Sequence, residues 1–131
     1  MKNKEVCKVI LADRDGFYLQ RLKRCLERKG EMQVLAMTDS GQKLLEMAKE
    51  LQPDVILLDE PISALDVANR EAMKAELKQL QKKFNVTMLF ITHDQEEAFA
   101  MSDRIMIMRE ANVVQLDTPE NIIDHPADDY V

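Results

Sequence analysis

Five short apolar runs recur along the chain at roughly regular intervals. They cover residues 9–12, 34–37, 55–58, 88–91 and 105–108. A short continuous apolar run is typical of a strand that is buried on both faces, as in a parallel sheet. The pattern therefore predicts five strands of one buried parallel sheet.

Amphipathic helical patterns separate the first four runs. Apolar residues recur there with helical spacing, which predicts helices with one buried face. The three stripes are Tyr18, Leu22, Cys25 and Leu26, then Leu44, Met47, Ala48 and Leu51, then Met73, Leu77, Leu80 and Phe84. A fourth, shorter helix is expected after Asp94, an N-cap with Glu97 three residues later. This alternation predicts an α/β fold with a doubly wound sheet.

Cap residues and turn residues mark the ends of these elements. Ser40 and Ser63 are expected to cap the second and third helices, and Gly30 is placed to end the first in a left-handed turn. After the fifth run, the connection 110–112 and the apolar stretch 113–116 predict a hairpin. Thr118 then caps a short helix with Pro119 at its first position. Residues from His125 onward are expected to form a frayed tail.

Composition narrows the possible classes of function. The chain has 131 residues, 46% hydrophobic and 32% charged, which fits one globular domain with a sizeable core. The net charge of −6 argues against a nucleic-acid partner. No apolar run approaches the roughly 20 residues of a membrane span, and no signal peptide is visible. Cys7 and Cys25 lie in apolar patterns and are interpreted as core thiols of a cytoplasmic protein. Without a long apolar run, no membrane partner is expected.

The charge is distributed unevenly. Residues 1–55 contain 11 Lys and Arg against 9 Asp and Glu, whereas residues 56–131 contain 7 against 15. This difference is consistent with two parts of different origin.

Three stretches of the first half, 8–13, 40–45 and 52–59, carry a family resemblance. With them, residues 6–59 resemble the receiver domain of response regulators, most closely the sporulation type. The resemblance implies that Asp59 matches the phosphoacceptor and that Asp13 matches one of two acids that hold Mg²⁺, since clustered carboxylates bind hard cations. The second acid is replaced by Arg14, and Asp15 follows it. These residues give a Mg²⁺ site of Asp13, Asp15 and Asp59, with polar strand ends as the alternative interpretation.

The receiver resemblance also concerns the fourth and fifth strands. The family uses a hydroxyl at the end of the fourth strand, matched by Thr92, and a lysine at the end of the fifth. Arg109 is the nearest residue to that lysine. The receiver site is therefore incomplete, and polar strand ends are favoured over catalysis.

The second half carries a different set of motifs. They are found at 57–61, 63–66, 76–81, 91–98, 101–105 and 118–120. With them, residues 56–131 resemble the end of the nucleotide-binding domain of an ABC-transporter ATPase, from its Walker B strand onward. The resemblance implies that Asp59 supports Mg²⁺ and Glu60 polarises water. It also implies that His93 senses the γ-phosphate and that Asp66 lies in the D-loop.

The sequence lacks the parts that would hold a nucleotide. A phosphate-binding loop needs two glycines five residues apart, followed by Lys and Ser or Thr. The glycines are Gly16, Gly30 and Gly41, at spacings that no such loop allows, and the pentapeptide Leu-Ser-Gly-Gly-Gln is also absent. Without a loop to hold the triphosphate, Glu60 and His93 are interpreted as vestigial, and ATP is not expected to bind.

Both families place an apolar strand ending in Asp at the carboxyl edge of a parallel sheet, and this shared strand is where the fragments join. We expect one domain over 1–131, with a receiver-like segment 1–58 and an ABC-ATPase-like segment 59–131. The expected fold is a three-layer flavodoxin-like sheet of order 2-1-3-4-5 with a C-terminal hairpin and short helix. No long fifth helix covers the first helix, so an exposed apolar strip and a homodimer are expected there.

The favoured interpretation is an engineered chimeric scaffold without catalytic function or cofactor. Two alternatives stay open. One is a Mg²⁺-dependent phosphoacceptor that uses Asp59, and the other is a residual nucleotide-binding module.

Overall fold

The chain divides into two compact units, Met1–Ile91 and Thr92–Val131. The computed structural model describes residues 6–13, 15–59, 67–92 and 94–128 of them. The boundary follows the last residue of a strand, well downstream of the expected join at residue 58. A single domain over 1–131 therefore stays a prediction.

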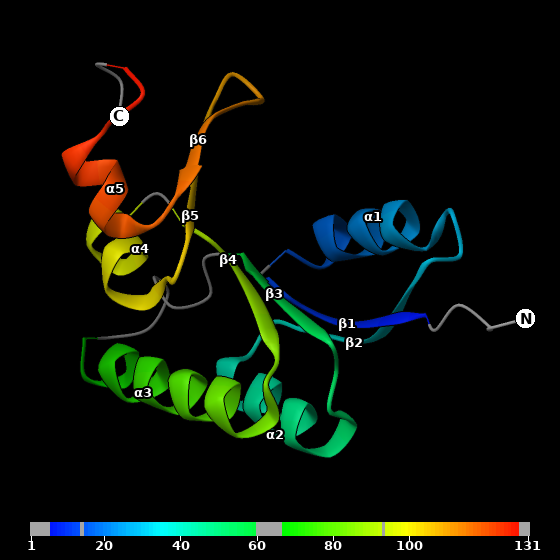
Figure 1. Ribbon diagram of the computed structural model, residues 1–131. Coiled ribbons are helices and arrows are strands. Elements are labelled where there is room, and N and C mark those ends of the chain that lie inside the picture. The colour runs from blue at the N-terminus through cyan, green and yellow to red at the C-terminus, as the bar shows by residue number, and fades with distance from the viewer. Residues whose placement is uncertain (1–5, 14, 60–66, 93, 129–131) are drawn as a thin grey trace, which may run out of the picture. The chain divides into compact units, whose positions relative to one another are not determined.

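The first unit contains a four-stranded parallel sheet. Its strands are β1 (Cys7–Ala12), β2 (Met32–Thr38), β3 (Val55–Asp59) and β4 (Thr87–Ile91). They lie in the order β2-β1-β3-β4, and every neighbouring pair is parallel (Figure 1). This confirms the first four places of the predicted order.

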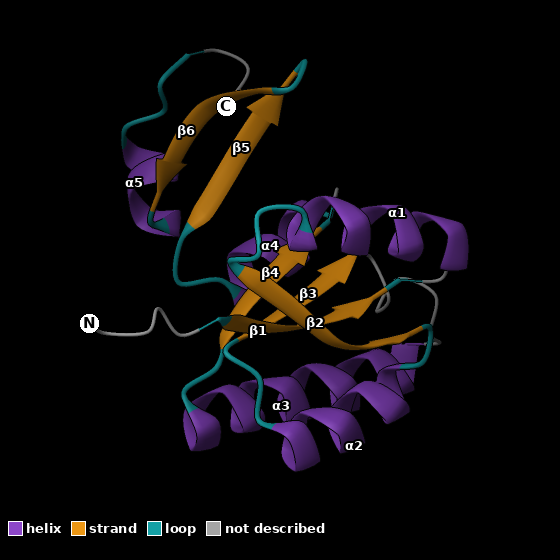
Figure 2. Ribbon diagram, turned by 90° about the vertical axis from the view of Figure 1, so that its right-hand side faces the viewer, coloured by secondary structure: helices purple, strands orange, loops and turns teal. Residues whose placement is uncertain are grey.

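Helices cover both faces of this sheet. Helix α1 (Gly16–Glu27) lies on one face, and α2 (Gly41–Leu51) and α3 (Val67–Phe84) lie on the other (Figure 2). The predicted α/β flavodoxin-like architecture is thus confirmed.

Local sequence sets the ends of these helices as expected. The Ser40 side chain accepts a hydrogen bond from the Lys43 N–H and caps α2. Gly30 follows α1 with φ +74, the left-handed conformation that glycine adopts without strain. Ser63 lies outside the described residues.

Two buried layers form the core of the first unit. On the α1 face, one cluster contains Val9, Leu11, Leu19, Val34 and Leu57, with Leu22 and Leu26 packed against it. Alternation along the strands places Ile10, Ile56 and Leu58 on the opposite face, toward α2 and α3. These three and Leu44, Leu45, Ala48, Leu77 and Leu80 are buried.

Two apolar stripes differ from prediction. Cys25 is exposed, so its interpretation as a core thiol is wrong, and Cys7 is only partly buried. In α1, Leu19 is the buried residue, because the stripe that meets the sheet runs through Leu19, Leu22 and Leu26. In α2, Leu45 takes the buried place that was expected for Leu51, which is exposed.

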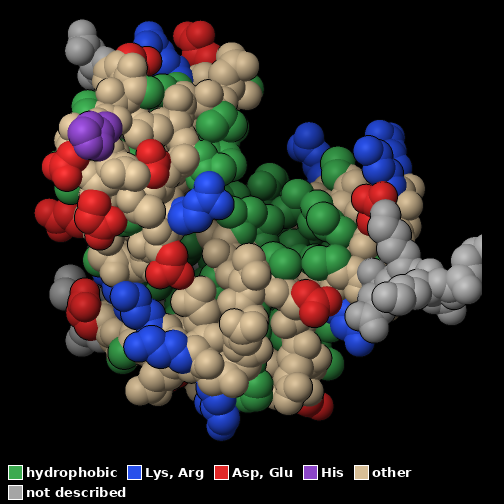
Figure 3. Space-filling view, viewed as in Figure 1, with side chains coloured by type: hydrophobic (Ala, Val, Ile, Leu, Met, Phe, Trp, Pro, Cys, Tyr) green, Lys and Arg blue, Asp and Glu red, His purple; other side chains and the backbone are tan. Residues whose placement is uncertain are grey.

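Strand β4 is buried less than its apolar sequence predicts. Leu89 is 51% exposed and Ile91 is 40% exposed. Leu89 pairs in register with Leu57 and therefore shares the α1 face, but α1 packs mainly against β2 and leaves β4 open. Hydrophobic side chains gather on this side of the sheet, beside α1 (Figure 3). An exposed apolar strip is therefore present on the α1 face of the sheet, along β4, and a homodimer through it stays a prediction.

The second unit consists of two short helices and a hairpin. Its elements are α4 (Gln95–Met101), β5 (Ile105–Arg109), β6 (Asn112–Asp117) and α5 (Pro119–Asp124). Strands β5 and β6 are antiparallel, and Glu110 and Ala111 form the turn with positive φ of 49 and 65. Thr118 caps α5, and Pro119 opens it. The predicted hairpin and helix are confirmed.

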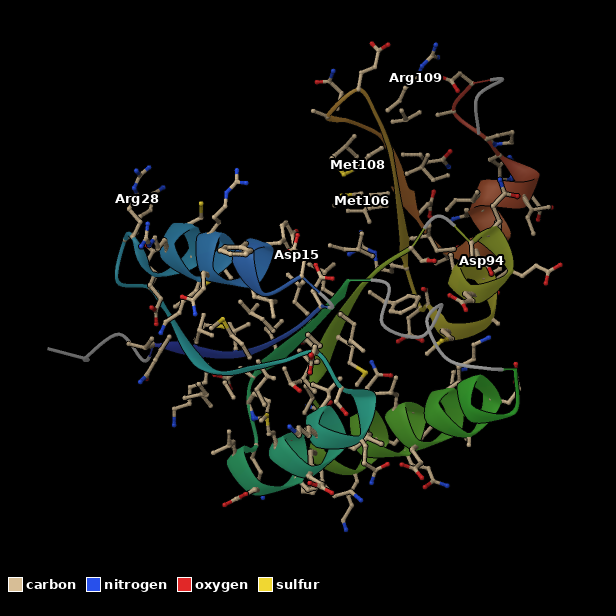
Figure 4. The ribbon with its side chains drawn as sticks, turned by 180° about the vertical axis from the view of Figure 1, so that it is seen from behind. Asp15, Arg28, Asp94, Met106, Met108 and Arg109 are labelled. Atoms are coloured by element: carbon tan, nitrogen blue, oxygen red, sulfur yellow. The ribbon has the colours of Figure 1, made fainter. Side chains whose placement is uncertain are left out.

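The predicted place of the fifth strand is not found. Among the described residues, β5 pairs with β6 in a separate sheet and not with β4. A two-residue turn closes the hairpin at low entropic cost, and the hairpin leaves one face of β5 in solvent. Met106 and Met108 are exposed and project from the same side of the hairpin (Figure 4). The prediction of a strand buried on both faces is therefore wrong for β5.

The segment after α5 is also more ordered than a frayed tail. The Gln115 side-chain amide donates to the His125 carbonyl at 3.2 Å, and its Oε1 accepts from the Ala127 N–H at 2.9 Å. One side chain on β6 therefore holds two points of this segment. No helix of the described segments is long and apolar enough to cross a membrane.

Candidate functional site

Two acidic positions meet at the carboxyl edge of the sheet in the first unit. Strands β1 and β3 are paired in register up to Ala12 and Leu58, and Asp13 and Asp59 are the next residues of the two chain segments. The Asp13 N–H donates to the Thr38 carbonyl at 3.1 Å, which ties this position to β2 as well. The backbone of Asp59 ends β3 opposite Ile91. The fold thus brings Asp13 and Asp59 to neighbouring positions, as predicted.

Asp15, the third acid of the predicted Mg²⁺ set, caps helix α1 (Figure 4). Its Oδ1 accepts hydrogen bonds from the Phe17 N–H at 3.0 Å and the Tyr18 N–H at 3.2 Å. The first N–H groups of a helix have no partner within the helix, so this cap stabilises α1. The Asp15 N–H in turn donates to Asp13 Oδ1 at 3.4 Å. One oxygen of Asp15 is thus committed to the helix start.

Several predicted site residues fall on parts that the structure does not describe. Arg14, Glu60, Asp66 and His93 lie outside the described residues, and so does the side chain of Asp59. Among the side chains that the structure does describe, no group of three or more His, Cys, Asp and Glu could hold a metal ion. The Mg²⁺ set of Asp13, Asp15 and Asp59 therefore stays a prediction.

In the second unit, Thr92 belongs to a relay at the start of α4. The Asp94 N–H donates to Thr92 Oγ1 at 3.0 Å, and Thr92 Oγ1 donates to Glu97 Oε2 at 3.4 Å. Asp94 caps the helix, since its Oδ1 accepts from the Glu96 and Glu97 N–H groups. In the expected capping box, Glu97 would accept directly from the Asp94 N–H. Here the Thr92 hydroxyl lies between the two groups and bonds to both. Glu97 is buried.

This relay shows what sequence reasoning missed. The sequence patterns assign Thr92 only to phosphoryl chemistry and Glu97 only to the helix cap, and neither pattern predicts the bond between the two. The signal was present in the spacing Thr-x-Asp-x-x-Glu, which allows the hydroxyl to bridge two residues of the same helix start.

A second cluster of polar groups surrounds Asp117, at the end of β6. Asp117 Oδ1 accepts from the Asn121 side chain at 2.9 Å and from the Thr118 N–H at 2.8 Å. These bonds, the side-chain bond of Asn121 first, lower the pKa of Asp117, and the positive charge of Arg104 acts in the same direction. This cluster stabilises the junction of β6 and α5.

The predicted basic residue, Arg109, ends β5 opposite Asn112 and is exposed. Arg109 and Thr92 both belong to the second unit, whereas Asp13 and Asp59 belong to the first. Chemically, the first unit offers a pair of acidic positions at a sheet edge. The second unit offers hydrogen-bond networks at helix starts.

In sequence, the chain is similar to ATP-binding proteins of polyamine importers. It is 44% identical over 108 residues to the spermidine/putrescine import ATP-binding protein PotA of Legionella pneumophila, which covers 81% of this chain and 30% of that protein. PotA of Clostridioides difficile is 42% identical over 108 residues, covering 81% and 31%. The chain therefore spans about 30% of the length of these relatives. No family model matches the chain.

This similarity extends further upstream than residue 56. A match over 108 residues is longer than the segment 56–131, so it enters the segment that resembles receiver domains. Because the match covers 81% of the 131 residues, it begins at about residue 26 or earlier, and the two resemblances overlap over β2, α2 and β3. An amphipathic helix followed by an apolar strand that ends in Asp suits both families, which accounts for the part of the overlap that includes α2 and β3.

In fold, the chain is similar to a receiver domain and to a pilus assembly-related protein. The signal receiver domain of a modulated diguanylate cyclase from Desulfovibrio desulfuricans aligns with a TM-score of 0.51 and 26% identity over 72% of each chain. A putative pilus assembly-related protein from Burkholderia pseudomallei aligns with a TM-score of 0.54 and 22% identity, over 72% of this chain and 68% of that one. The second likeness concerns the fold alone. With the sequence relatives, these findings support a chimera of receiver-like and ABC-ATPase-like fragments.

Proposed function

We propose that this chain is an engineered chimeric scaffold that recombines fragments of a response-regulator receiver and an ABC ATPase, without a catalytic function of its own. One observation carries the proposal. The groups that a receiver site would need, Asp15 and Thr92, are bound to the starts of α1 and α4. A carboxylate or hydroxyl oxygen that completes a helix start is held in place by those hydrogen bonds, and using the same oxygen for a ligand would break them.

The proposal includes the absence of a cofactor and of a nucleic-acid partner. The net charge of −6 supports the second point, because an acidic surface repels phosphates. ATP hydrolysis is excluded from the proposal on chemical grounds. The sequence has no phosphate-binding loop, and a triphosphate that is not held in place cannot be attacked in line.

The test is an amide NMR spectrum of the labelled protein with Mg²⁺, before and after addition of beryllofluoride, which mimics a phosphoryl group on a carboxylate. We expect a dispersed spectrum that the mimic leaves unchanged. Turnover of acetyl phosphate or ATP that depends on Mg²⁺ would contradict the scaffold proposal. Asp59→Asn must then abolish the turnover for the activity to be assigned to this site.

A second candidate function is a Mg²⁺-dependent phosphoacceptor, favoured by the neighbouring positions of Asp13 and Asp59 at the sheet edge. In this reaction a carboxylate oxygen of Asp59 attacks phosphorus, a new P–O bond forms, and acetate leaves from acetyl phosphate with the bridging oxygen. Mg²⁺ held by Asp13 and Asp59 would offset the charge of the phosphoryl oxygens.

Mass spectrometry after incubation with acetyl phosphate and Mg²⁺ separates this candidate from the scaffold. A phosphoryl adduct in the parent chain and in Asp103→Asn, but not in Asp59→Asn, would establish the phosphoacceptor. Asp103 is a suitable control because it is an exposed acid of the second unit. An adduct that persists in Asp59→Asn would assign the phosphorylation to another residue.

A third candidate is residual nucleotide binding, which rests on the printed name of the relatives as ATP-binding proteins. Calorimetry with ATP and Mg²⁺ at millimolar concentration tests it. Saturable heat would support a nucleotide site, whereas the scaffold proposal predicts only heat of dilution. A cytoplasmic location and a homodimer complete the proposal.

A further inference from the structure

Within the described segments of the first unit, the sheet ends in a strand that is paired on one side only. Within the part of the chain that the structure describes, β4 pairs with β3 on one side and with no strand on the other. Its sequence is Thr-Met-Leu-Phe-Ile, and its pairing with β3 shows no bulge. Natural sheets protect edge strands with charges, proline or bulges, because exposed N–H and C=O groups attract another strand. β4 carries none of these protections.

The register with β3 determines which backbone groups of β4 are available. The Thr87 N–H donates to the Asp54 carbonyl at 3.1 Å, on the β3 side. In a parallel strand, alternate residues direct both N–H and C=O to the same side. Thr87, Leu89 and Ile91 therefore bond toward β3, and Met88 and Phe90 direct their backbone groups outward.

We propose that a second copy of this chain pairs with β4 through its own β4, antiparallel and centred on Leu89. This inference rests on the homodimer of the proposed function and gives it an interface, whereas the absence of catalysis is tested separately. A two-fold axis requires identical strands to run antiparallel. Centring on Leu89 places Met88 opposite the partner's Phe90, and these residues carry the outward N–H and C=O groups. Each of the two symmetric pairs then forms two backbone hydrogen bonds, which use all the outward N–H and C=O groups of Met88 and Phe90.

The side chains suit the same register. On the α1 face, Leu89 meets the partner's Leu89 across a pair without hydrogen bonds, where side chains approach most closely. Ile91 meets the partner's Thr87. On the opposite face, Met88 lies beside the partner's Phe90, a favourable thioether–aromatic contact. The pairing covers Leu89 and Ile91, which are 51% and 40% exposed in the single chain.

Charges on either side of the strand favour the antiparallel direction. Lys82 and Lys83 lie in the last turn of α3, before β4, whereas Asp94 and Glu96 follow β4 at the start of α4. Antiparallel pairing brings the basic end of one copy toward the acidic end of the other. The opposite direction would bring like charges together at each end.

Sedimentation equilibrium of the full chain tests the proposal, from about 1 to about 300 µM, because an interface this small forms a weak complex. Leu89→Lys places two ammonium groups across the two-fold axis, and we expect dimerisation to weaken at least about tenfold. Leu116→Lys is the matched control, since Leu116 is 44% exposed on the hairpin. A monomer at all concentrations would overturn the proposal. Unchanged dimerisation of Leu89→Lys, or loss only in Leu116→Lys, would assign the contact to another surface.

Cysteine cross-linking tests the register itself. In a background with Cys7→Ala and Cys25→Ser, Leu89→Cys is expected to form a disulfide-linked dimer under mild oxidation. Phe90→Cys is the control, because in this register it lies diagonally from its own copy, beyond disulfide range. Cross-linking of Phe90→Cys but not of Leu89→Cys would overturn the register. If the cysteine background does not fold by circular dichroism, the sedimentation comparison still decides the proposal.

Discussion

The substitution Ile56→Ala tests whether the side chains around the shared strand β3 are packed as closely as in a natural core. Ile56 lies in β3, the strand that both resemblances include, and its side chain is 0% exposed. Ile56→Ala removes three carbons, which costs about 2.4 kcal/mol at roughly 0.8 kcal/mol for each buried carbon. The cavity that remains adds to this, so we expect a loss of about 3–4 kcal/mol in the free energy of unfolding. Such a loss is a large part of the roughly 5–15 kcal/mol that stabilises a domain.

The measurement is urea unfolding followed by the amide NMR signals of the first unit, with Ile123→Ala as the control. Ile123 is the same residue type but is 67% exposed, so its truncation is expected to cost less than about 0.5 kcal/mol. A loss below about 1 kcal/mol for Ile56→Ala, with an unchanged urea slope, would refute native packing. It would indicate that the elements around β3 close over the missing carbons as a loosely packed core does.

Three further predictions concern single hydrogen-bonding side chains. Asp15→Ala removes the cap of α1 and should lower the free energy of unfolding of the first unit by about 1 kcal/mol, measured by urea unfolding. An unchanged urea midpoint would show that the cap does not stabilise this unit. Hydrogen bonds lower the pKa of Asp117 in the folded chain below its value in the unfolded chain. Asp117 therefore stabilises the fold fully above the pKa of an ordinary carboxyl group, and this stabilisation is lost as the pH falls through the folded pKa. Unfolding measured between about pH 2 and 5 should therefore depend less on pH in Asp117→Asn, and parallel curves would contradict this. Gln115→Ala should speed hydrogen exchange at the Ala127 amide, and equal rates would show that other contacts hold that segment.

Local patterns predicted most elements of the fold. Apolar runs identified β1 and β3 as buried strands, and capping residues such as Ser40 and Thr118 marked helix starts. These features depend on neighbours in the chain, so sequence spacing is sufficient to find them. The burial of β4 and β5 could not be predicted in the same way. It depends on which helix covers each strand, and an apolar strand at a sheet edge has the same sequence as a central one.

The candidate site was predicted in part. Parallel strands end at a common edge, so Asp13 and Asp59 were expected to be neighbours, and the register of β1 and β3 places them so. The capping role of Asp15 and the bond from Thr92 to Glu97 were missed. A carboxylate or hydroxyl next to a strand end can serve a ligand or a helix start. Only the hydrogen-bond geometry distinguishes the two.

The sequence by itself determined the alternation of strands and helices, the hairpin turn and the two family resemblances. All of these reside in residue types and their spacing over a few positions or a few tens of positions. The tertiary structure alone decided that β5 pairs with β6 rather than β4, and that β4 remains an edge with Leu89 in solvent. Strand pairing is a choice among distant partners with similar local sequences. The short loop between β5 and β6 makes that pairing less costly in chain entropy than a longer connection.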